Sequence, residues 1–174
     1  AVSVAKLALL PDSIVYDIGA GTGSVAIACG RVAVDGHVYA IEKNPDAVEL
    51  LKKNRNKCKA SNVTIISGTA PEALETLPVP THAFIGGTGG NLARILEALW
   101  VKNPGIRIVL NAISLETISA IQQLVSGLHE HSDPAEFATE FVTVTVARTR
   151  EVGSYHLMMG ENPIWIVTLH RKGN

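Results

Sequence analysis

A glycine loop is the part of this 174-residue sequence whose residue types and spacing point most directly to chemistry. Residues 17–25 read Asp-Ile-Gly-Ala-Gly-Thr-Gly-Ser-Val, with glycines at alternate positions. Glycine allows a tight turn and lets a ligand approach without a Cβ clash. The dinucleotide pattern G-x-G-x-x-G would place its third glycine at position 24, where the chain has Ser24. The loop therefore departs from the pyrophosphate-binding pattern and carries an acidic residue, Asp17, beside the turn; a tight turn without a ligand is the alternative.

Two further segments have the chemistry of a nucleoside site. Glu42 follows the apolar run 38–41, and a carboxylate at the end of a strand can accept both hydroxyls of a ribose. Its alternative is a surface residue that pairs with Lys43. Residues 68–71 read Gly-Thr-Ala-Pro after another apolar run, and we expect this loop to lie against an adenine. The alternative for that loop is a turn that opens a helix.

A second glycine cluster is expected on the substrate side. Residues 86–90 read Gly-Gly-Thr-Gly-Gly and would form a wide floor, poor in side chains, for a bulky flat substrate. Backbone amides there can receive carboxylates. We expect this loop to lie away from the loop at 19–23 and to serve the substrate more than the cofactor, unless it is simply flexible. Thr88 and Asn111, at the ends of the fourth and fifth predicted strands, are expected to touch the substrate.

The apolar pattern predicts the elements that position these loops. Short apolar runs predict strands at 14–18, 37–41, 63–66, 82–85 and 106–110. Amphipathic segments between them predict helices at about 22–34, from the capping pair Asn44-Pro45 onward, briefly after Pro71, and over 92–99 and 118–128. Runs at 141–146 and 164–169 have no helix between them. Alternating strands and helices imply a parallel sheet covered on both faces, and the last pair implies an antiparallel hairpin at one edge.

This layout and the loop D-x-G-x-G-x-G resemble the class I methyltransferases, which bind S-adenosylmethionine (SAM) on a Rossmann-like, mostly parallel α/β sheet. SAM carries an ammonium and a sulfonium but no pyrophosphate, which suits an acidic residue beside the loop. The resemblance implies a set of cofactor-binding residues: Asp17, Gly19, Ala20, Gly21, Thr22, Gly23, Glu42, Lys43, Gly68, Thr69 and Ala70. The expected substrate-binding residues are Gly86, Gly87, Thr88, Gly89, Gly90 and Asn111.

Taken together, the motifs at 17–25, 42–45, 68–71 and 86–90 resemble the decarboxylating precorrin methyltransferases of cobalamin biosynthesis, over essentially the whole chain. The resemblance implies methylation of carbon C15 of a precorrin tetrapyrrole, with loss of carbon dioxide from the ring C acetate. It implies a homotetramer. It also implies that residues 1–174 form a single domain lacking an upstream segment that helps cover the site. We expect residues that position the substrate and no catalytic triad, and the sequence assigns no catalytic residue.

Composition excludes several other classes. Hydrophobic residues make up 47% of the chain and charged residues 18%, and no apolar run approaches the roughly 20 residues of a membrane span. The net charge of −1 argues against a nucleic-acid partner, and the basic stretch 52–59 is expected to be a solvated helix face. Cys29 and Cys58 are expected to be free, buried or half-buried thiols in a reducing cytoplasm, and His129 and His131 to be solvated loop residues rather than metal ligands.

Three alternatives remain from the residues alone. A class I methyltransferase of RNA or protein would share every cofactor motif, with an upstream domain supplying any RNA contact. A non-catalytic SAM-binding module would bind the cofactor without turnover. A nicotinamide-dependent dehydrogenase is disfavoured by Ser24, although Glu42 suits either cofactor.

Overall fold

The computed structural model describes residues 1–131 and 137–171 of the chain. Its helical elements are α1 (Val2–Leu7), α2 (Ser24–Gly30), α3 (Pro45–Lys57), the short 3₁₀ helix η1 (Glu72–Leu74), α4 (Leu92–Lys102) and α5 (Leu115–His131). Its strands are β1 (Ile14–Ile18), β2 (His37–Glu42), β3 (Val63–Ser67), β4 (His82–Ile85), β5 (Arg107–Ala112), β6 (Phe137–Val144), β7 (Ala147–Val152), β8 (Tyr155–Gly160) and β9 (Ile164–Arg171).

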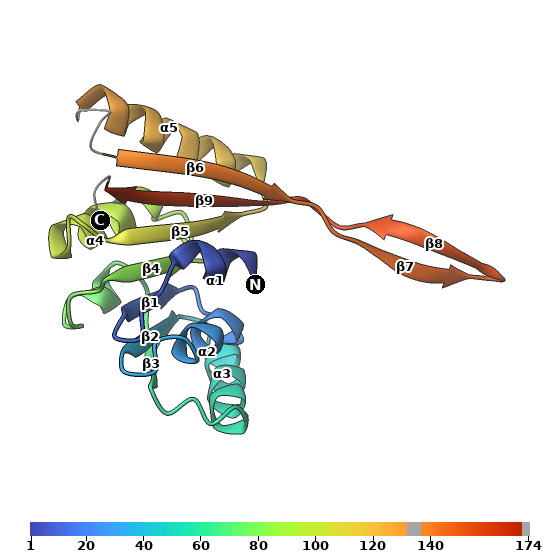
Figure 1. The fold of residues 1–174 in the computed structure, drawn as a ribbon, viewed down its shortest axis with the longest axis horizontal. Helices are drawn as coiled ribbons and strands as arrows, with labels where there is room; N and C mark the ends of the chain where they lie inside the picture. Colours follow the sequence, from blue (N-terminus) through green and yellow to red (C-terminus); the bar gives the residue numbers. More distant parts are fainter. Residues whose placement is uncertain (132–136, 172–174) are drawn as a thin grey trace.

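Seven strands form one sheet in the order β3-β2-β1-β4-β5-β9-β6. The five strands β1 to β5 run parallel, and β9 inserts antiparallel between β5 and β6 (Figure 1). The chain crosses over after β3, so β1 and β4 become neighbours at the middle of the sheet. This arrangement confirms the predicted fold class, a mostly parallel sheet that ends in an antiparallel pair.

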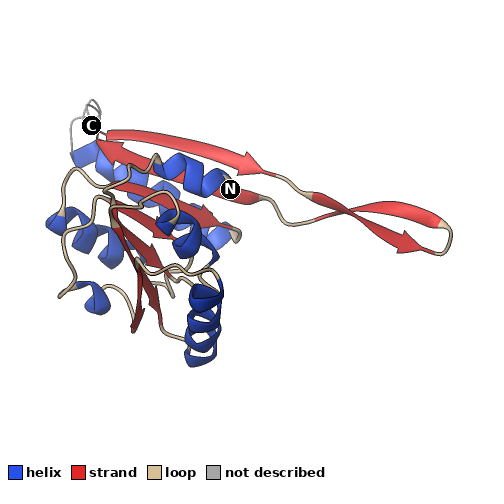
Figure 2. Cartoon of the chain, turned by 60° about the horizontal axis from the view of Figure 1, so that its bottom comes forward, coloured by secondary structure: helices blue, strands red, loops and turns tan. Residues whose placement is uncertain are grey.

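Helices cover both faces of the sheet (Figure 2), because each central strand is apolar on both sides. In β5, Ile108 and Leu110 pack with α4 and α5, whereas Val109 points to the opposite face. The opposite face is covered by α1, α2 and α3 through Leu7, Ala26 and Leu51 and their neighbours. Two buried layers therefore hold the strand ends in place, which is what a site at one edge of the sheet requires.

Several predicted boundaries of helices and strands lie close to the observed ones, and the bounds of two elements were predicted wrongly. Asn44 caps α3, its side chain accepting from the backbone N–H of Asp46 at 2.9 Å, and Pro45 is the first helical residue, as predicted. The helix predicted at about 22–34 is α2, which spans only Ser24–Gly30, and the left-handed Gly23 directly precedes it. The predicted strand 141–146 is divided: β6 ends at Val144 and β7 begins at Ala147.

An arm made of β7 and β8 is the element that the sequence pattern missed. These strands form a separate two-stranded sheet that projects away from the body of the molecule (Figures 1 and 2). Every residue of both strands is exposed. The arm leaves the body where β6 ends, and Val144 pairs there with Ile164, one step beyond the pair Ala112–Trp165. It is therefore rooted at the carboxyl edge of the parallel strands.

Candidate functional site

The loop after β1 turns at the carboxyl edge of the sheet, held by its neighbour β2. The backbone N–H groups of Gly19 and Ala20 both donate to the carbonyl of Ile41, each at 3.0 Å. Gly19, Gly21 and Gly23 all have positive φ, a left-handed conformation that glycine adopts most readily. The alternate glycines of the sequence motif thus shape a turn whose backbone lies open at the strand ends.

Glu42 is held with both carboxylate oxygens engaged. Oε2 accepts the backbone N–H of Gly21 at 2.8 Å, and Oε1 accepts the backbone N–H of Asn44, also at 2.8 Å. Each carboxylate oxygen still has a free lone pair. Among the described residues no ion pair joins Glu42 to Lys43, so the structure does not have the alternative in which Glu42 is a surface residue paired with Lys43. The carboxylate is therefore fixed in orientation and able to accept two hydroxyls.

A cavity of about 230 Å³ opens beside Glu42. Its polar edge contains Glu42 and Lys43, and the loop at 68–70 forms another wall. Apolar side chains of Ile18, Ile41 and Ile95 also line it. A planar apolar base against the isoleucines and a sugar diol at Glu42 would match this lining. The site residues expected for a nucleoside thus lie together around one cavity, which we call the nucleoside cavity.

A second cavity, of about 460 Å³, lies on the β5 side of the first, and we call it the substrate cavity. It is lined by the ends of β1, β4 and β5 and by the start of α5, where the Ser114 hydroxyl accepts from the backbone N–H of Thr117 at 3.3 Å. Asn111 also lines it, as does Ile164 at the root of the arm. Its walls combine apolar side chains with polar groups, and hydroxyl and amide groups lie at the α5 end.

Asp17 is the charged residue in the lining of the substrate cavity. It is 1% exposed, and neither of its carboxylate oxygens has a hydrogen-bond partner among the described residues. Burial raises the pKa of the Asp17 carboxyl to about 7; the backbone N–H of Ala26 acts against this shift, and the Glu42 charge adds to it. A buried carboxylate without a partner is unfavourable unless a ligand satisfies it. The ammonium of SAM has the charge and the donors that this carboxylate lacks.

The two cavities meet at the loop after β4. Gly19, Gly87 and Thr88 line both of them. A Cβ on Gly19 would lie 2.8 Å from the backbone N and O of Gly87, so the two loops are in close contact. The expectation that the loop at 86–90 lies away from the loop at 19–23 is therefore wrong. The sequence did not reveal that β1 and β4 are neighbours, and neighbouring parallel strands bring their following loops together.

Gly21 contributes to the site through its backbone. A Cβ at this position would meet no protein atom within 4 Å. The close approaches are at Gly19, against Gly87, and at Gly23, where a Cβ would lie 1.9 Å from Cδ1 of Leu51. Gly21 needs glycine for its φ of 53° and places its N–H on Glu42.

Most of the predicted site residues line one cavity or the other, and four line neither. Gly21, Thr22 and Gly23 belong to the turn but line neither cavity, and the Thr22 carbonyl accepts from the Asn54 side chain at 2.9 Å. Gly90 lies outside both linings. The sequence pattern did not indicate that the apolar residues of the cavity walls, or the start of α5, belong to the site. A Ser-x-x-Thr pair just after β5, with the hydroxyl at the helix cap, was the available signal for the latter.

The remaining expectations concern metal ligands, two histidines, the cysteines and membrane-spanning helices. The described residues contain no group of His, Cys, Asp or Glu side chains placed to hold a metal ion. His129 and His131 belong to α5 rather than to a loop, and their side chains lie outside the described part of the structure. Both cysteines are free, Cys29 buried as expected but Cys58 exposed. Among the described helices, none has the length and apolar character needed to cross a membrane.

Comparisons with known proteins agree on one family. A family profile described as precorrin methyltransferase domain matches residues 1–171. A relative from Sulfurisphaera tokodaii, named "Probable cobalt-precorrin-6B C(15)-methyltransferase (decarboxylating)", is 40% identical over 172 residues, which cover 95% of this chain and 83% of the relative. A crystal structure of precorrin-6y C5,15-methyltransferase from Geobacter metallireducens has a TM-score of 0.85 at 35% identity, covering 97% of this chain and 86% of that chain. The structure of a Methanobacterium thermoautotrophicum protein titled precorrin 8w decarboxylase has a TM-score of 0.83 at 29% identity, covering 97% and 87%.

Proposed function

This chain belongs to the precorrin methyltransferase family, and from that premise we propose that it methylates C15 of a precorrin-6B-type tetrapyrrole, with SAM as the methyl donor. In the same turnover the ring C acetate loses carbon dioxide. The observation that carries the proposal is the pair of cavities that meet at Gly87 and Thr88, one suited to a nucleoside and one larger, with both apolar and polar groups in its walls. With its nucleoside in the first cavity and its ammonium group at Asp17 in the second, SAM would present its methyl group near that shared wall, where a flat acceptor in the second cavity would meet it.

The residues present fit SAM. Glu42 would accept the two ribose hydroxyls, and Ile18, Ile41 and Ile95 with the loop at 68–70 would surround the adenine. Asp17, buried and without a partner, would receive the ammonium group. When bound, SAM supplies an electrophilic methyl group on sulfur. The protein's own contribution is alignment, which is the largest advantage available to an in-line displacement.

On the acceptor side, the chain supplies shape and hydrogen-bond donors. Gly86, Gly87 and Gly89 leave the loop after β4 with Thr88 as its main side chain toward the cavities, so a flat macrocycle can approach closely. Thr88 and Asn111 would contact the tetrapyrrole, as would backbone amides of this loop. Breaking the bond to the departing carboxylate leaves an electron pair, which the conjugated macrocycle can take up before a proton replaces the carboxylate. No strong general base is required of the protein for that step.

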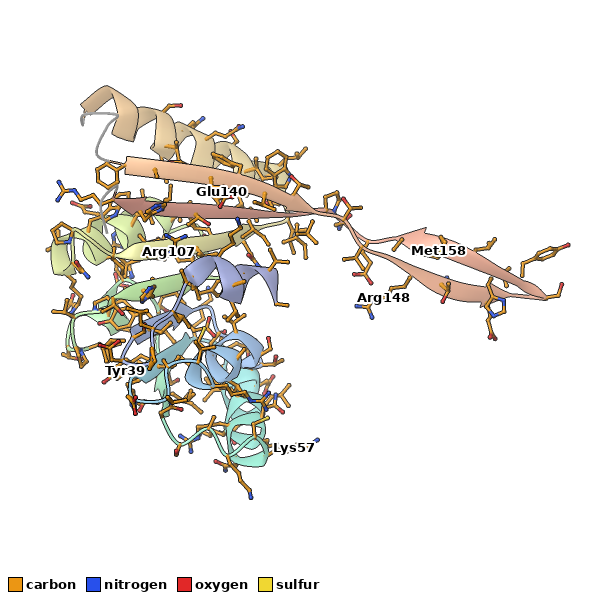
Figure 3. All side chains as sticks on the ribbon, viewed as in Figure 1. Tyr39, Lys57, Arg107, Glu140, Arg148 and Met158 are labelled. Carbon is orange, nitrogen blue, oxygen red and sulfur yellow. The ribbon has the colours of Figure 1, made fainter. Side chains whose placement is uncertain are left out.

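The assembled enzyme is proposed to be a homotetramer in the cytoplasm, with the arm as a contact between copies. The strand register places one set of arm side chains on a single face: Arg148, Arg150, Val152, Tyr155, Leu157 and Met159. Four of these are large apolar residues, and Tyr155 is 71% exposed. A lone two-stranded ribbon is marginal in water. The arm side chains Arg148 and Met158 lie far from the sheet (Figure 3), so another copy is the partner that would cover this face.

The proposal is tested by following a tetrapyrrole through the reaction. The protein is incubated with methyl-labelled SAM and cobalt-precorrin-6B, and the tetrapyrrole is examined by mass spectrometry. The expected product carries the labelled methyl group. Calorimetry should detect SAM binding but no NAD binding, and Glu42→Ala should weaken SAM binding by about ten- to a hundredfold, because one or two charge-assisted hydrogen bonds are lost. Tight NAD binding without SAM binding would refute the proposal.

A further inference from the structure

Helix α1 makes a direct contact with the candidate site through one buried side chain. Ser3 lies in the first turn of α1, is 8% exposed, and donates its hydroxyl hydrogen to Oδ1 of Asn111 at 2.9 Å. Asn111 stands at the carboxyl end of β5 and lines the substrate cavity. These two residues are far apart in sequence, so the contact depends on how α1 packs against β5.

This hydrogen bond fixes which end of the Asn111 amide is available to a ligand. Oδ1 is engaged by Ser3, and Nδ2, with its two hydrogens, has no hydrogen-bond partner among the described residues. Nδ2 is not among the buried polar atoms that lack a hydrogen-bond partner, which means that it is accessible to a ligand. Without Ser3, an asparagine amide at this position could rotate by 180° and present its acceptor instead. Ser3 therefore favours the donor orientation.

The charges around the cavity explain why a donor matters there. The lining of the substrate cavity contains Asp17 as its charged residue and no lysine or arginine. A precorrin-type substrate is an anion, since it carries acetate and propionate groups. A carboxylate that enters this cavity would therefore meet neutral donors, and the amide N–H₂ of Asn111 is one of them. We propose that Ser3 is a positioning residue that orients the Asn111 amide to donate to a carboxylate of the tetrapyrrole.

Two other contacts hold α1 in place without touching Asn111. Arg107 Nε donates to the Lys6 carbonyl at 2.8 Å, and Lys6 Nζ pairs with Glu140 Oε1 at 2.7 Å. In Figure 3, Arg107 and Glu140 lie on neighbouring parts of the sheet beside α1. Lys6 therefore offers a matched control: its removal loosens the helix at an exposed ion pair and leaves the Ser3–Asn111 contact intact.

The inference rests on the proposed function, and its main test uses steady-state kinetics with cobalt-precorrin-6B. Ser3→Ala should raise the KM for the tetrapyrrole about three- to tenfold, the value of one hydrogen bond, while SAM affinity by calorimetry stays the same. Ser3→Thr keeps the hydroxyl and should recover most of the wild-type KM. Lys6→Ala should leave KM unchanged. A KM for Ser3→Ala equal to that of the wild type overturns the inference.

A double-mutant cycle separates positioning from general loosening of α1. Asn111→Ala should raise KM, and adding Ser3→Ala to it should have no further effect, because the amide to be positioned is gone. Independent, multiplicative effects would contradict the proposal. If the wild-type protein does not turn over the tetrapyrrole, the proposed function fails instead. The orientation is then read without substrate from the Asn111 side-chain amide signals in NMR, which should shift in Ser3→Ala and remain in place in Lys6→Ala.

Discussion

Gly19 is the residue on which the contact between the two ligand-facing loops depends. A side chain there would push against the backbone of Gly87 at 2.8 Å, and backbone cannot rotate out of the way as a side chain can. Gly19→Ala should therefore separate the loops and widen the wall that the two cavities share. We expect SAM affinity, measured by calorimetry, to fall about tenfold or more, beyond the strain of about 1–2 kcal/mol that left-handed φ imposes on alanine.

Gly21→Ala is the control for that prediction. Gly21 also has positive φ, so alanine would carry a similar backbone strain, but its Cβ would meet no atom within 4 Å. Urea unfolding should show comparable losses of stability from strain in both variants, with an additional loss only in Gly19→Ala. Equal SAM affinities in the two variants would mean that the loop contact at Gly87 does not shape the site.

Asp17 should make the stability of the free protein depend on pH. Its pKa is raised from the ordinary 3.8 to about 7 in the folded state, chiefly by burial. Between about pH 4 and pH 7 the folded protein holds a proton that the unfolded chain has released. The stability contribution of Asp17 is therefore full below about pH 4, and it is lost as the pH rises toward 7.

Asp17→Asn removes this dependence while keeping the shape of the side chain. The variant should gain stability relative to the wild type as the pH rises from about 4 to about 7, by about 4 kcal/mol over the whole interval, and the gain should level off near pH 8. Urea unfolding at each pH without ligand provides the comparison. Two stability curves that stay parallel across this range would show that the buried carboxyl does not titrate there.

At the level of single residues, some members of the candidate site could be predicted from the sequence and others could not. Glu42 was predicted to lie at a ligand site because it directly follows a strand, and in the structure it lines the nucleoside cavity. The direct contact of Gly19 with Gly87 could not be predicted, since it arises from the crossover that places β4 beside β1. Ile18, Ile41 and Ile95 were also missed, because apolar residues in a cavity wall have the same pattern as apolar residues in a core.

At the scale of elements, the arm of β7 and β8 is the feature with the clearest consequence for assembly. If the face that carries Leu157 packs against another copy, a charge there should separate the copies. Leu157→Arg should shift the protein from a tetramer toward smaller species in sedimentation velocity, because a desolvated arginine without a partner opposes association. Far-UV circular dichroism should remain unchanged, since β7 and β8 form a sheet of their own, separate from the seven-stranded sheet.

The opposite face of the arm supplies the matched control. Met158 pairs with Thr149 on that face and is 65% exposed, so Met158→Arg should leave the assembly intact. A wild-type protein that sediments as a monomer would contradict the role of the arm, as would equal disruption by the two variants.

The strands of the arm could not be predicted from the hydrophobic pattern of the sequence. Alternation over 141–146 predicted a single strand, and the structure divides it between β6 and β7. Residues 147–160 mix arginine, threonine, methionine and glycine without the alternation of a half-buried strand, because neither face of the arm is buried in the single chain. A strand whose burial requires another molecule leaves little periodic signal in its own sequence.

At the scale of the whole molecule, topology converts scattered motifs into one site. The parallel strands end at one edge, so loops separated by up to some ninety residues in the sequence line two adjoining cavities. The order of the five parallel strands and of the helices between them could be predicted, which was enough to recognise the fold, whereas α1 and the arm strands β7 and β8 were not predicted. The insertion of β9 between β5 and β6 could not be predicted, because nothing local distinguishes an inner from an outer strand of a final pair.

The central claim is that one site couples methyl transfer to loss of carbon dioxide, and a stoichiometry tests it most directly. The protein is mixed with methyl-labelled SAM and with cobalt-precorrin-6B labelled in the ring C acetate carboxyl, and both labels are followed over time. We predict one carbon dioxide released for each methyl group transferred, with neither label moving in the absence of the protein. Methyl transfer that leaves the carboxyl label on the tetrapyrrole, or no transfer to the tetrapyrrole by a protein that binds SAM, would contradict the account.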